Sequence, residues 1–201
     1  MGYREWLSVA AIALTFAGFV PYIRTVRQGR VKPHVFSWMI WGSTTFVVFL
    51  AQLSDGGGAG AWPIGVSGLV TLYIAVLAYG RRSDTRITRT DWGCFLVATA
   101  SLPLWYLSAD PFWAVLVLTT VDLAGFGPTL REALAHPFEE NLTFFILFAL
   151  RNLVAILALE RYTATTVLFP AATGLACVVL IALVGLRRQR VAASRDGGPM
   201  A

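Results

Sequence analysis

Two charged residues lie inside long apolar stretches of the sequence, where ionisable side chains are rare. Asp122 belongs to the stretch 111–130, and Arg151 belongs to the stretch 142–160. At a helical rise of about 1.5 Å per residue, Asp122 lies about 10 Å and Arg151 about 13 Å from the adjacent ends of these stretches, so the two charges can meet. Ionisable groups inside a membrane are costly and usually functional. The pair is therefore either a structural ion pair, or a site where Arg151 attracts an anionic substrate group and Asp122 is its resting partner.

Aromatic residues that end at a polar side chain share one helical face in the stretches 35–53 and 142–160. The spacing i, i+3, i+7 occurs in both stretches. The residues are Trp38, Trp41 and Thr45 in the first stretch, and Phe145, Phe148 and Asn152 in the second. Apolar walls that orient a few polar groups are typical of a ligand pocket, with helix packing as the alternative. Trp41, Thr45, Phe148 and Asn152 are the candidates for such a pocket, whereas Trp38 is favoured as part of an interfacial aromatic belt.

Small polar residues in two further stretches extend this set. Ser67 lies in the stretch 61–79 and Thr173 in the stretch 165–186. In membrane helices such residues mostly support close packing and hydrogen bonds between helices. Ser67 and Thr173 are therefore second-rank candidates for the pocket.

Two prolines close to the ends of apolar stretches are candidate hinges. Pro21 and Pro128 are each followed three residues later by an arginine. Proline removes a backbone donor and kinks or ends a helix, so each proline is either a gate hinge or a terminator beside a loop. Their occurrence at equivalent positions favours hinges.

The sequence offers no constellation for catalysis or for a resident cofactor. It lacks a nucleophile elbow, a phosphate-binding glycine loop and a zinc motif. Cys94 and Cys177 are interpreted as small apolar fillers. His34 and His136 lie in loops without a cluster at metal spacing, apart from the neighbouring acidic pair 139–140. We expect neither enzymatic activity nor a bound metal.

The amino-acid composition indicates that lipid, rather than water alone, surrounds the chain. The chain has 201 residues, of which 57% are hydrophobic and 13% are charged. Soluble domains carry about 45–50% apolar and about 25% charged residues. A domain of this size cannot hide so much apolar surface from water, so the composition indicates a membrane protein and excludes soluble, disordered and disulfide-rich classes.

Seven apolar stretches approach the roughly 20 residues that cross a bilayer as a helix. They lie at 6–24, 35–53, 61–79, 91–108, 111–130, 142–160 and 165–186. The first could instead be a signal peptide, with Arg4 as its basic region, but it lacks a good cleavage site. The sequence therefore predicts an all-α integral membrane fold with seven transmembrane helices.

Basic residues gather in alternate loops. The loops at 24–34, 81–91 and 131–141 and the end of the chain after 187 hold most of them, while Arg4 and Arg161 are alone on the other side. Positive residues favour the cytoplasm, which predicts a multi-pass protein of the plasma membrane with the N-terminus outside and the C-terminus inside. Because these charges are spread over four loops as orientation signals, a nucleic-acid partner is not expected.

An internal repeat organises the stretches. A shift of 107 residues aligns 6–82 with 113–189 without a gap, and Ala17-Gly18-Phe19-x-Pro21-x-x-Arg24 falls on Ala124-Gly125-Phe126-x-Pro128-x-x-Arg131. We therefore expect a first three-helix repeat at 1–82, a linker helix at 83–110, a second repeat at 111–190 and a flexible cytoplasmic tail at 191–201. Because a single linker helix joins the two triplets, both have the same orientation in the membrane. Such parallel repeats are a recurrent plan of transporters, in which the substrate path lies between the halves.

This layout, with a proline at the basic end of the first helix of each triplet, resembles the PQ-loop/SWEET superfamily of membrane transporters. Pro21 and Pro128 carry the resemblance, which covers about residues 6–189. The sequence departs from the pattern at Tyr22 and Thr129, where the family has glutamine, and it lacks the asparagine pair of the sugar-transporting members. The resemblance implies transport by alternating access, but it does not favour a sugar.

The expected function is movement of a small polar or anionic metabolite across the bilayer. Asp122, Arg151 and the pocket candidates would line the path, and Pro21 and Pro128 would gate it. One alternative is a vitamin-precursor transporter of the nicotinamide riboside type, although Trp38 and Trp41 lack the accompanying asparagine. Another is a non-transporting membrane receptor or assembly factor of the same fold. The expected partners are the lipid bilayer and a small-molecule substrate, and a homo-oligomer is compatible with this plan.

Overall fold

The chain folds into α-helices throughout the part that the computed structural model describes, which comprises residues 2–31, 33–81, 89–138 and 142–196. Seven α-helices and one short 3-10 helix occur in these residues. They are α1 (Tyr3–Arg27), α2 (Val35–Ser54), η1 (Gly58–Ala61), α3 (Trp62–Gly80), α4 (Arg89–Ser108), α5 (Pro111–Ala135), α6 (Leu142–Leu157) and α7 (Ala164–Asp196). The predicted all-α fold is confirmed. Each predicted apolar stretch falls on one helix, although α6 ends at Leu157, before the predicted end at 160.

Length and hydropathy identify the helices that can cross a membrane. Among the described residues, four segments are both long and apolar enough: Tyr3–Arg27, Val35–Ser54, Gly58–Gly80 and Ala164–Ala192. Shorter apolar segments lie at Phe95–Ser108, Pro111–Gly127 and Leu142–Leu157. Many large apolar side chains on these helices are exposed, including Tyr106, Leu107 and Val76. An apolar exterior of this extent is typical of a membrane-embedded protein.

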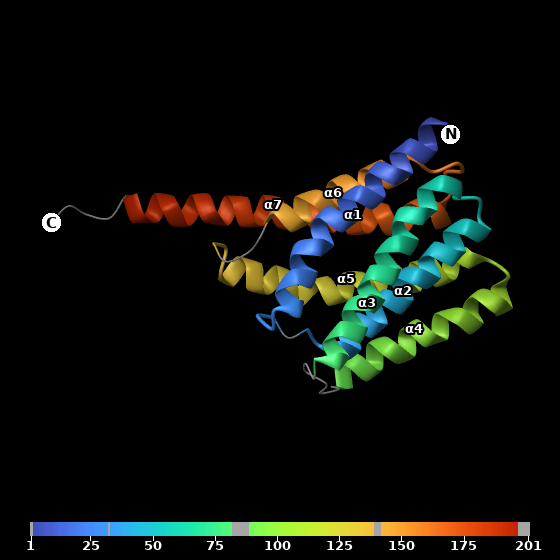
Figure 1. Cartoon of the computed structure of the whole chain (residues 1–201), viewed down its shortest axis with the longest axis horizontal. Coiled ribbons are helices and arrows are strands. Elements are labelled where there is room, and N and C mark those ends of the chain that lie inside the picture. Colours follow the sequence, from blue (N-terminus) through green and yellow to red (C-terminus); the bar gives the residue numbers. More distant parts are fainter. Residues whose placement is uncertain (1, 32, 82–88, 139–141, 197–201) are drawn as a thin grey trace.

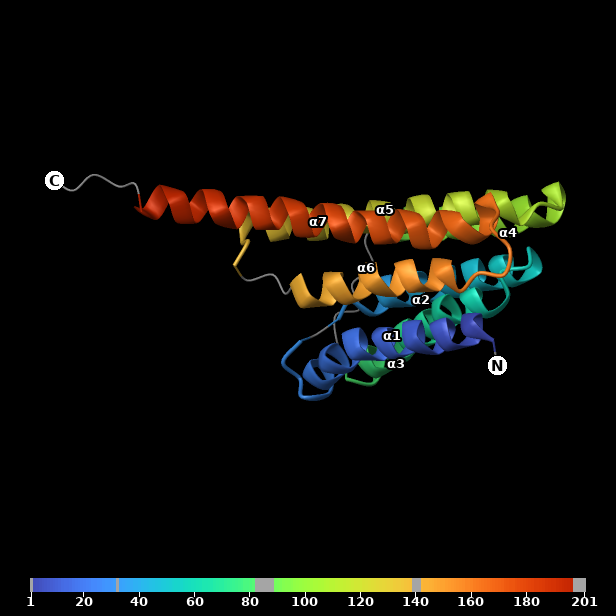
Figure 2. The same ribbon diagram turned by 90° about the horizontal axis from the view of Figure 1, so that it is seen from above.

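The helices form two groups that face each other. Within the first group α3 packs between α1 and α2, and within the second α7 packs between α5 and α6. The groups meet where α1 contacts α6 and α2 contacts α5, while α4 lies against α5 at the edge of the bundle (Figure 1). Figure 2 shows α5 and α7 along one side and α1 and α3 along the other, with α2 and α6 between them. The space between the groups is thus bordered by α1, α2, α5 and α6.

The helices begin and end close to the predicted positions, with two instructive differences. Helix α1 continues to Arg27, so Pro21 lies inside it rather than near its end. Helix α7 continues to Asp196, into the segment 191–201 expected as a tail. Arginine, glutamine and alanine favour helix, which explains this extension. At 33 residues, α7 is about 50 Å long, more than a bilayer core requires, and it projects beyond the bundle (Figure 1).

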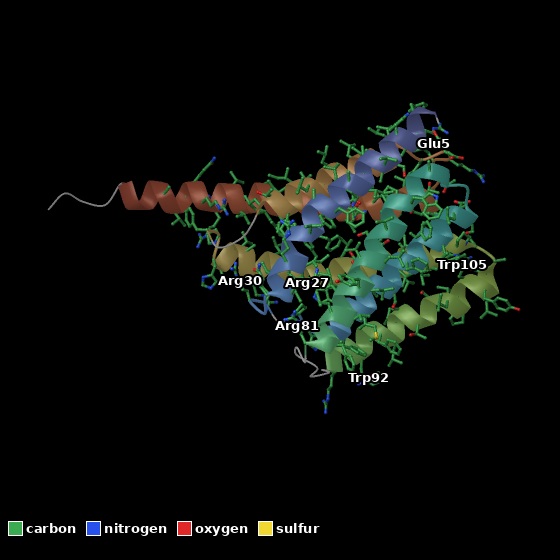
Figure 3. All side chains as sticks on the ribbon, viewed as in Figure 1. Glu5, Arg27, Arg30, Arg81, Trp92 and Trp105 are labelled. Carbon is green, nitrogen blue, oxygen red and sulfur yellow. The ribbon has the colours of Figure 1, made fainter. Side chains whose placement is uncertain are left out.

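The two ends of the bundle carry different charges. Arg27, Arg30 and Arg81 lie at the end opposite Glu5 (Figure 3). We call the end that contains these arginines the basic end, and the end that contains Glu5 the closed end. Several residues of the charge pattern lie outside the described residues, namely Lys32, Arg82, Arg86, Glu139 and Glu140.

At the closed end, the segment before α3 is hydrogen-bonded to the loop between α6 and α7. The backbone N–H of Glu160 donates to the carbonyl of Gly57 at 3.2 Å, and its Oε1 accepts from the N–H of Ala59 at 3.1 Å. At Gly60 the backbones are so close that an added Cβ would lie 2.5 Å from the backbone nitrogen of Leu159. The two groups are therefore in direct backbone contact here.

Side chains add to this closure. Asp55 forms an ion pair with Arg161 at 3.9 Å and accepts a hydrogen bond from the hydroxyl of Thr163. Deeper in the bundle, the buried amide of Gln52 donates to the carbonyl of Thr166 at 2.7 Å. An apolar cluster packs beside these contacts, formed by Val48, Phe49, Ala51, Ala61, Ile64, Val115, Leu118 and Phe169. The closed end is thus sealed by polar contacts at its surface and by apolar packing below.

Candidate functional site

A cavity of about 550 Å³ lies between the two groups of helices. Six helices line it, namely α1, α2, α3, α5, α6 and α7. Thr45, Ser67 and Asn152 line its part nearer the closed end, and Tyr22 and Trp38 line its part nearer the basic end. The exposed Thr143, at the start of α6, also lines the cavity, so the cavity has an opening at the basic end, which we call its mouth. Ala17 and Leu123, which are also exposed, line it farther from that end. The volume lies in the range typical of small-molecule sites.

Arg151 is the buried cation of this cavity. It lies in the middle of α6 and is only 3% exposed. Its guanidinium carbon lies 4.9 Å from the centroid of the Phe148 ring, one turn earlier on the same helix. Its Nε and Nη1 atoms are buried and have no hydrogen-bond partner among the described residues. The guanidinium is thus held over an aromatic face with much of its donor capacity unused.

Asp122 supplies the opposite charge from α5. It is half-buried, lines the same cavity and interacts electrostatically with Arg151. Although both residues are described, the structure records neither a hydrogen bond nor an ion pair between them. The predicted pair is therefore brought into one cavity as two separate charges rather than as a closed salt bridge.

Asn152 follows Arg151 on α6 and is equally unusual. It is 1% exposed, and neither its amide nitrogen nor its amide oxygen has a hydrogen-bond partner among the described residues. Gly174 of α7 lets this side chain approach closely, because an added Cβ there would lie 3.1 Å from the Cβ of Asn152. The hydroxyls of Thr71 and Thr173, by contrast, donate to carbonyls one turn earlier at 2.8 Å. Among the described residues that line the cavity, unpartnered buried side-chain atoms thus occur at two consecutive residues of α6.

Aromatic side chains form much of the cavity wall. Phe144 and Phe148 are stacked with centroids 4.4 Å apart, and Phe19 meets Phe148 edge-on at 5.1 Å. Nearer the mouth, Tyr22 stacks on Trp38 at 5.0 Å. Such stacked and edge-on pairs are the favoured geometries of aromatic rings and hold their faces in fixed directions.

Two glycines allow aromatic rings to reach across the interface between the groups. A Cβ added at Gly18 of α1 would lie 2.8 Å from the ring of Phe148 on α6. A Cβ added at Gly125 of α5 would lie 2.8 Å from Nε1 of Trp41 on α2. The shift of 107 residues aligns Gly18 with Gly125, and Trp41 with Phe148. The two contacts thus use aligned positions and meet on opposite sides of the cavity.

All eight predicted substrate-path residues line this cavity. They are Trp41, Thr45, Ser67, Asp122, Phe148, Arg151, Asn152 and Thr173. Pro21 lines it as well, whereas the side chain of Pro128, in α5, lies outside the described part of the structure. Trp38, interpreted from the sequence as part of an aromatic belt, is also a lining residue.

Sequence reasoning missed several lining residues. Tyr22 and Cys177 were not proposed as pocket residues, yet both line the cavity. Phe19 and Phe126 also line it, and they are the aligned aromatic residues of the repeated motif. The motif was used only to align the repeat and to identify the candidate hinges. The aromatic residue that it places at aligned positions could have indicated these two lining residues.

The chemistry of the cavity is set by the polar groups in its walls. Among the described residues, no three His, Cys, Asp or Glu side chains gather to hold a metal ion. The cavity offers hydrogen-bond donors, the cation Arg151 and the carboxylate of Asp122 within aromatic walls. In comparisons with known proteins, no family model, curated protein or solved structure matches the chain.

Proposed function

We propose that this protein is a seven-helix membrane facilitator that moves a small polar or anionic metabolite by alternating access. The observation that carries the proposal is the cavity between the two helix groups, with the buried and unpaired Arg151 in its wall. A buried cation without a direct partner is costly, and such a group inside a membrane protein usually marks a substrate pathway.

The packing of the groups supports two related halves around this path. The contact of α1 with α6 corresponds, under the shift of 107 residues, to the contact of α5 with α2. The aligned contacts of Gly18 with Phe148 and of Gly125 with Trp41 follow the same relation. In this proposal residues 1–82 and 111–190 are parallel repeats, residues 83–110 are the linker helix, and the fold is of the PQ-loop/SWEET type.

The unequal ends of the bundle support alternating access. The cavity reaches the basic end, while hydrogen bonds and an ion pair hold the closed end together. By the positive-inside rule the basic end faces the cytoplasm, so this conformation faces inward in the plasma membrane. Movement of α1 and α5 at Pro21 and Pro128 would close the mouth when the opposite end separates.

A screen followed by a transport assay tests the proposal. The purified full chain is first heated with sugars, amino acids, carboxylates and nucleosides, because a bound ligand raises the unfolding temperature. The strongest hit is then offered as a radiolabelled compound to proteoliposomes. We expect uptake that saturates and is lost in Arg151→Gln.

Thr44→Val is the matched control for this assay. Thr44 of α2 is the residue that the shift of 107 aligns with Arg151. It is buried and does not line the cavity, and its hydroxyl donates a hydrogen bond to the carbonyl of Trp41. Uptake should therefore persist in this variant. Binding of the hit without uptake by the wild-type protein would instead support a receptor, and uptake that survives Arg151→Gln would remove Arg151 from the path.

A further inference from the structure

The polar side of the cavity is specialised for one kind of chemical group. Arg151 and Asn152 both line the cavity, are almost fully buried and keep unpartnered polar atoms in the described structure. Buried polar atoms normally have partners, and leaving them without partners is unfavourable. The only other unpartnered buried side-chain atom among the described residues, Oε1 of Gln52, lies outside the cavity lining. Arg151 and Asn152 are therefore the two exceptions at the cavity, where a ligand can supply the missing partner.

The buried guanidinium of Arg151 favours an anionic ligand. Four titratable side chains line it: Tyr22 from α1, Asp122 from α5, Arg151 from α6 and Cys177 from α7. The lining residues of α2 and α3 are not titratable; they are Trp38, Trp41, Thr45, Ser67 and Thr71. A guanidinium stays charged and forms parallel hydrogen bonds with the oxygens of a carboxylate or a sulfonate. Asn152, the next residue of α6, adds an uncharged hydrogen-bond donor in the same cavity.

The apolar side of the cavity favours a flat ring. The aromatic lining residues come from five helices and include Tyr22, Trp38, Trp41 and Phe148. Rings attract other rings through stacked and edge-on contacts beyond simple burial of area. Because the Arg151 guanidinium lies 4.9 Å from the Phe148 centroid, an acidic group at Arg151 brings an attached ring against these walls.

We propose that the cavity binds a flat, ring-bearing monoanion, with its acidic group at Arg151 and Asn152 and its ring among the aromatic side chains. Asp122 then repels the bound anion and competes for the attraction of Arg151. This inference deepens the proposed function and rests on it only for the statement that the same molecule is transported.

Calorimetric titration of the purified full chain with benzenesulfonate tests the ligand class. This probe stays ionised at all working pH values and carries one flat ring. Methanesulfonate keeps the charge without the ring, benzenesulfonamide keeps the ring without the charge, and cyclohexanesulfonate keeps a ring that is not flat. We expect benzenesulfonate to bind at least tenfold more tightly than each of these three compounds.

Variants test the placement of the anion. Arg151→Gln should weaken benzenesulfonate binding at least tenfold, and Arg151→Lys should recover part of it because the charge remains. Asp122→Asn should strengthen binding severalfold, since it removes the repelling carboxylate. Thr44→Val should leave binding within twofold of the wild-type value. Cooperative thermal unfolding of each variant shows that it is folded.

Each opposite result overturns a defined part of the proposal. If benzenesulfonamide bound as tightly as benzenesulfonate, the ligand would not need a negative charge. If methanesulfonate or cyclohexanesulfonate bound as tightly, the ligand would not need a flat ring. Weaker binding in Asp122→Asn, or no binding of benzenesulfonate to folded wild-type protein, would overturn the site as a whole. Transport is judged separately: benzenesulfonate that binds but does not enter proteoliposomes would contradict the proposed function alone, whereas transport of a different, ringless hit would contradict this ligand class alone.

Discussion

The two groups of three helices carry different chemistry at aligned positions. Thr15 of α1 aligns with Asp122, and Thr44 of α2 aligns with Arg151. Both threonines are buried, and each donates at 3.0 Å to a carbonyl of its own helix, at Ala11 and Trp41 respectively. Their polar atoms are therefore satisfied locally, whereas Arg151 has unpartnered atoms in the described structure. The first group contributes structure at these positions, and the second contributes charge.

The aromatic contacts across the interface differ much less between the groups. Phe148 reaches α1 at Gly18, and Trp41 reaches α5 at Gly125, with the same closest approach of 2.8 Å to an added Cβ. Packing and polar function are therefore separable in this fold. Aligned positions keep the same glycine-to-aromatic contact in both groups, whereas only the second group supplies charged side chains to the cavity.

The largest expected effect is loss of ligand binding in Arg151→Gln. Removing one partner of a buried charged hydrogen bond costs about 2–5 kcal/mol, which corresponds to a loss of binding of at least tenfold. Calorimetric titration with the strongest ligand measures this loss. Thr44→Val, at the aligned position, should change the dissociation constant less than twofold. Similar losses in both variants would show that the charge is not confined to the second group.

A smaller effect is expected from filling the two glycine contacts. Gly18→Val and Gly125→Val place side-chain atoms where Phe148 and Trp41 now lie. Overpacking of this kind costs about 1–3 kcal/mol, so both variants should unfold at lower temperature than the wild type. Thermal unfolding in the same detergent provides the measurement.

Gly80→Val serves as the control for the glycine variants, because an added Cβ at Gly80 has no neighbour within 4 Å. This position lies at the end of α3, so its substitution should change the unfolding temperature least. A large loss in only one of the two interface variants would contradict the equivalence of the contacts.

The smallest changes in affinity and stability are expected from substitution of Asp122 and of Thr15, the residue aligned with it. Asp122→Asn should increase the affinity for an anionic ligand by about 1 kcal/mol or less, as expected for a charge that is near but not paired. Thr15→Val should leave affinity unchanged and reduce stability by about 1 kcal/mol, because it removes one buried hydrogen bond. Titration and thermal unfolding of both variants separate the two roles, and an affinity change in Thr15→Val would refute this division.

The sequence predicts the helices well because hydropathy acts over whole turns. Long apolar stretches must satisfy their backbone hydrogen bonds internally, so each becomes a helix whatever its neighbours are. Helix ends are harder, as α7 shows. Its hydropathy falls after Leu186, but the following arginines and alanines favour helix, and the chain continues as helix to Asp196.

The candidate site was predictable where a residue was unusual for its surroundings. Arg151 and Asp122 stand out in apolar stretches, and Asn152 follows a helical aromatic face. Tyr22 and Cys177 did not stand out, since aromatic and small side chains are ordinary in membrane helices. Their part in the cavity depends on how α1 and α7 are rotated against helices distant in sequence, which spacing along one helix does not specify.

The hydrogen bonds of Glu160 with Gly57 and Ala59 have a consequence for the speed of a transporter of the proposed kind. In such a transporter, a molecule that enters beside Tyr22 and Trp38 would have to leave by the same route as long as these bonds persist. Affinity for the cargo would then be set at Arg151, and the turnover number would be set by how often the segment before α3 separates from the loop after α6. Tight binding and fast delivery could therefore evolve separately, through substitutions at opposite ends of the same molecule.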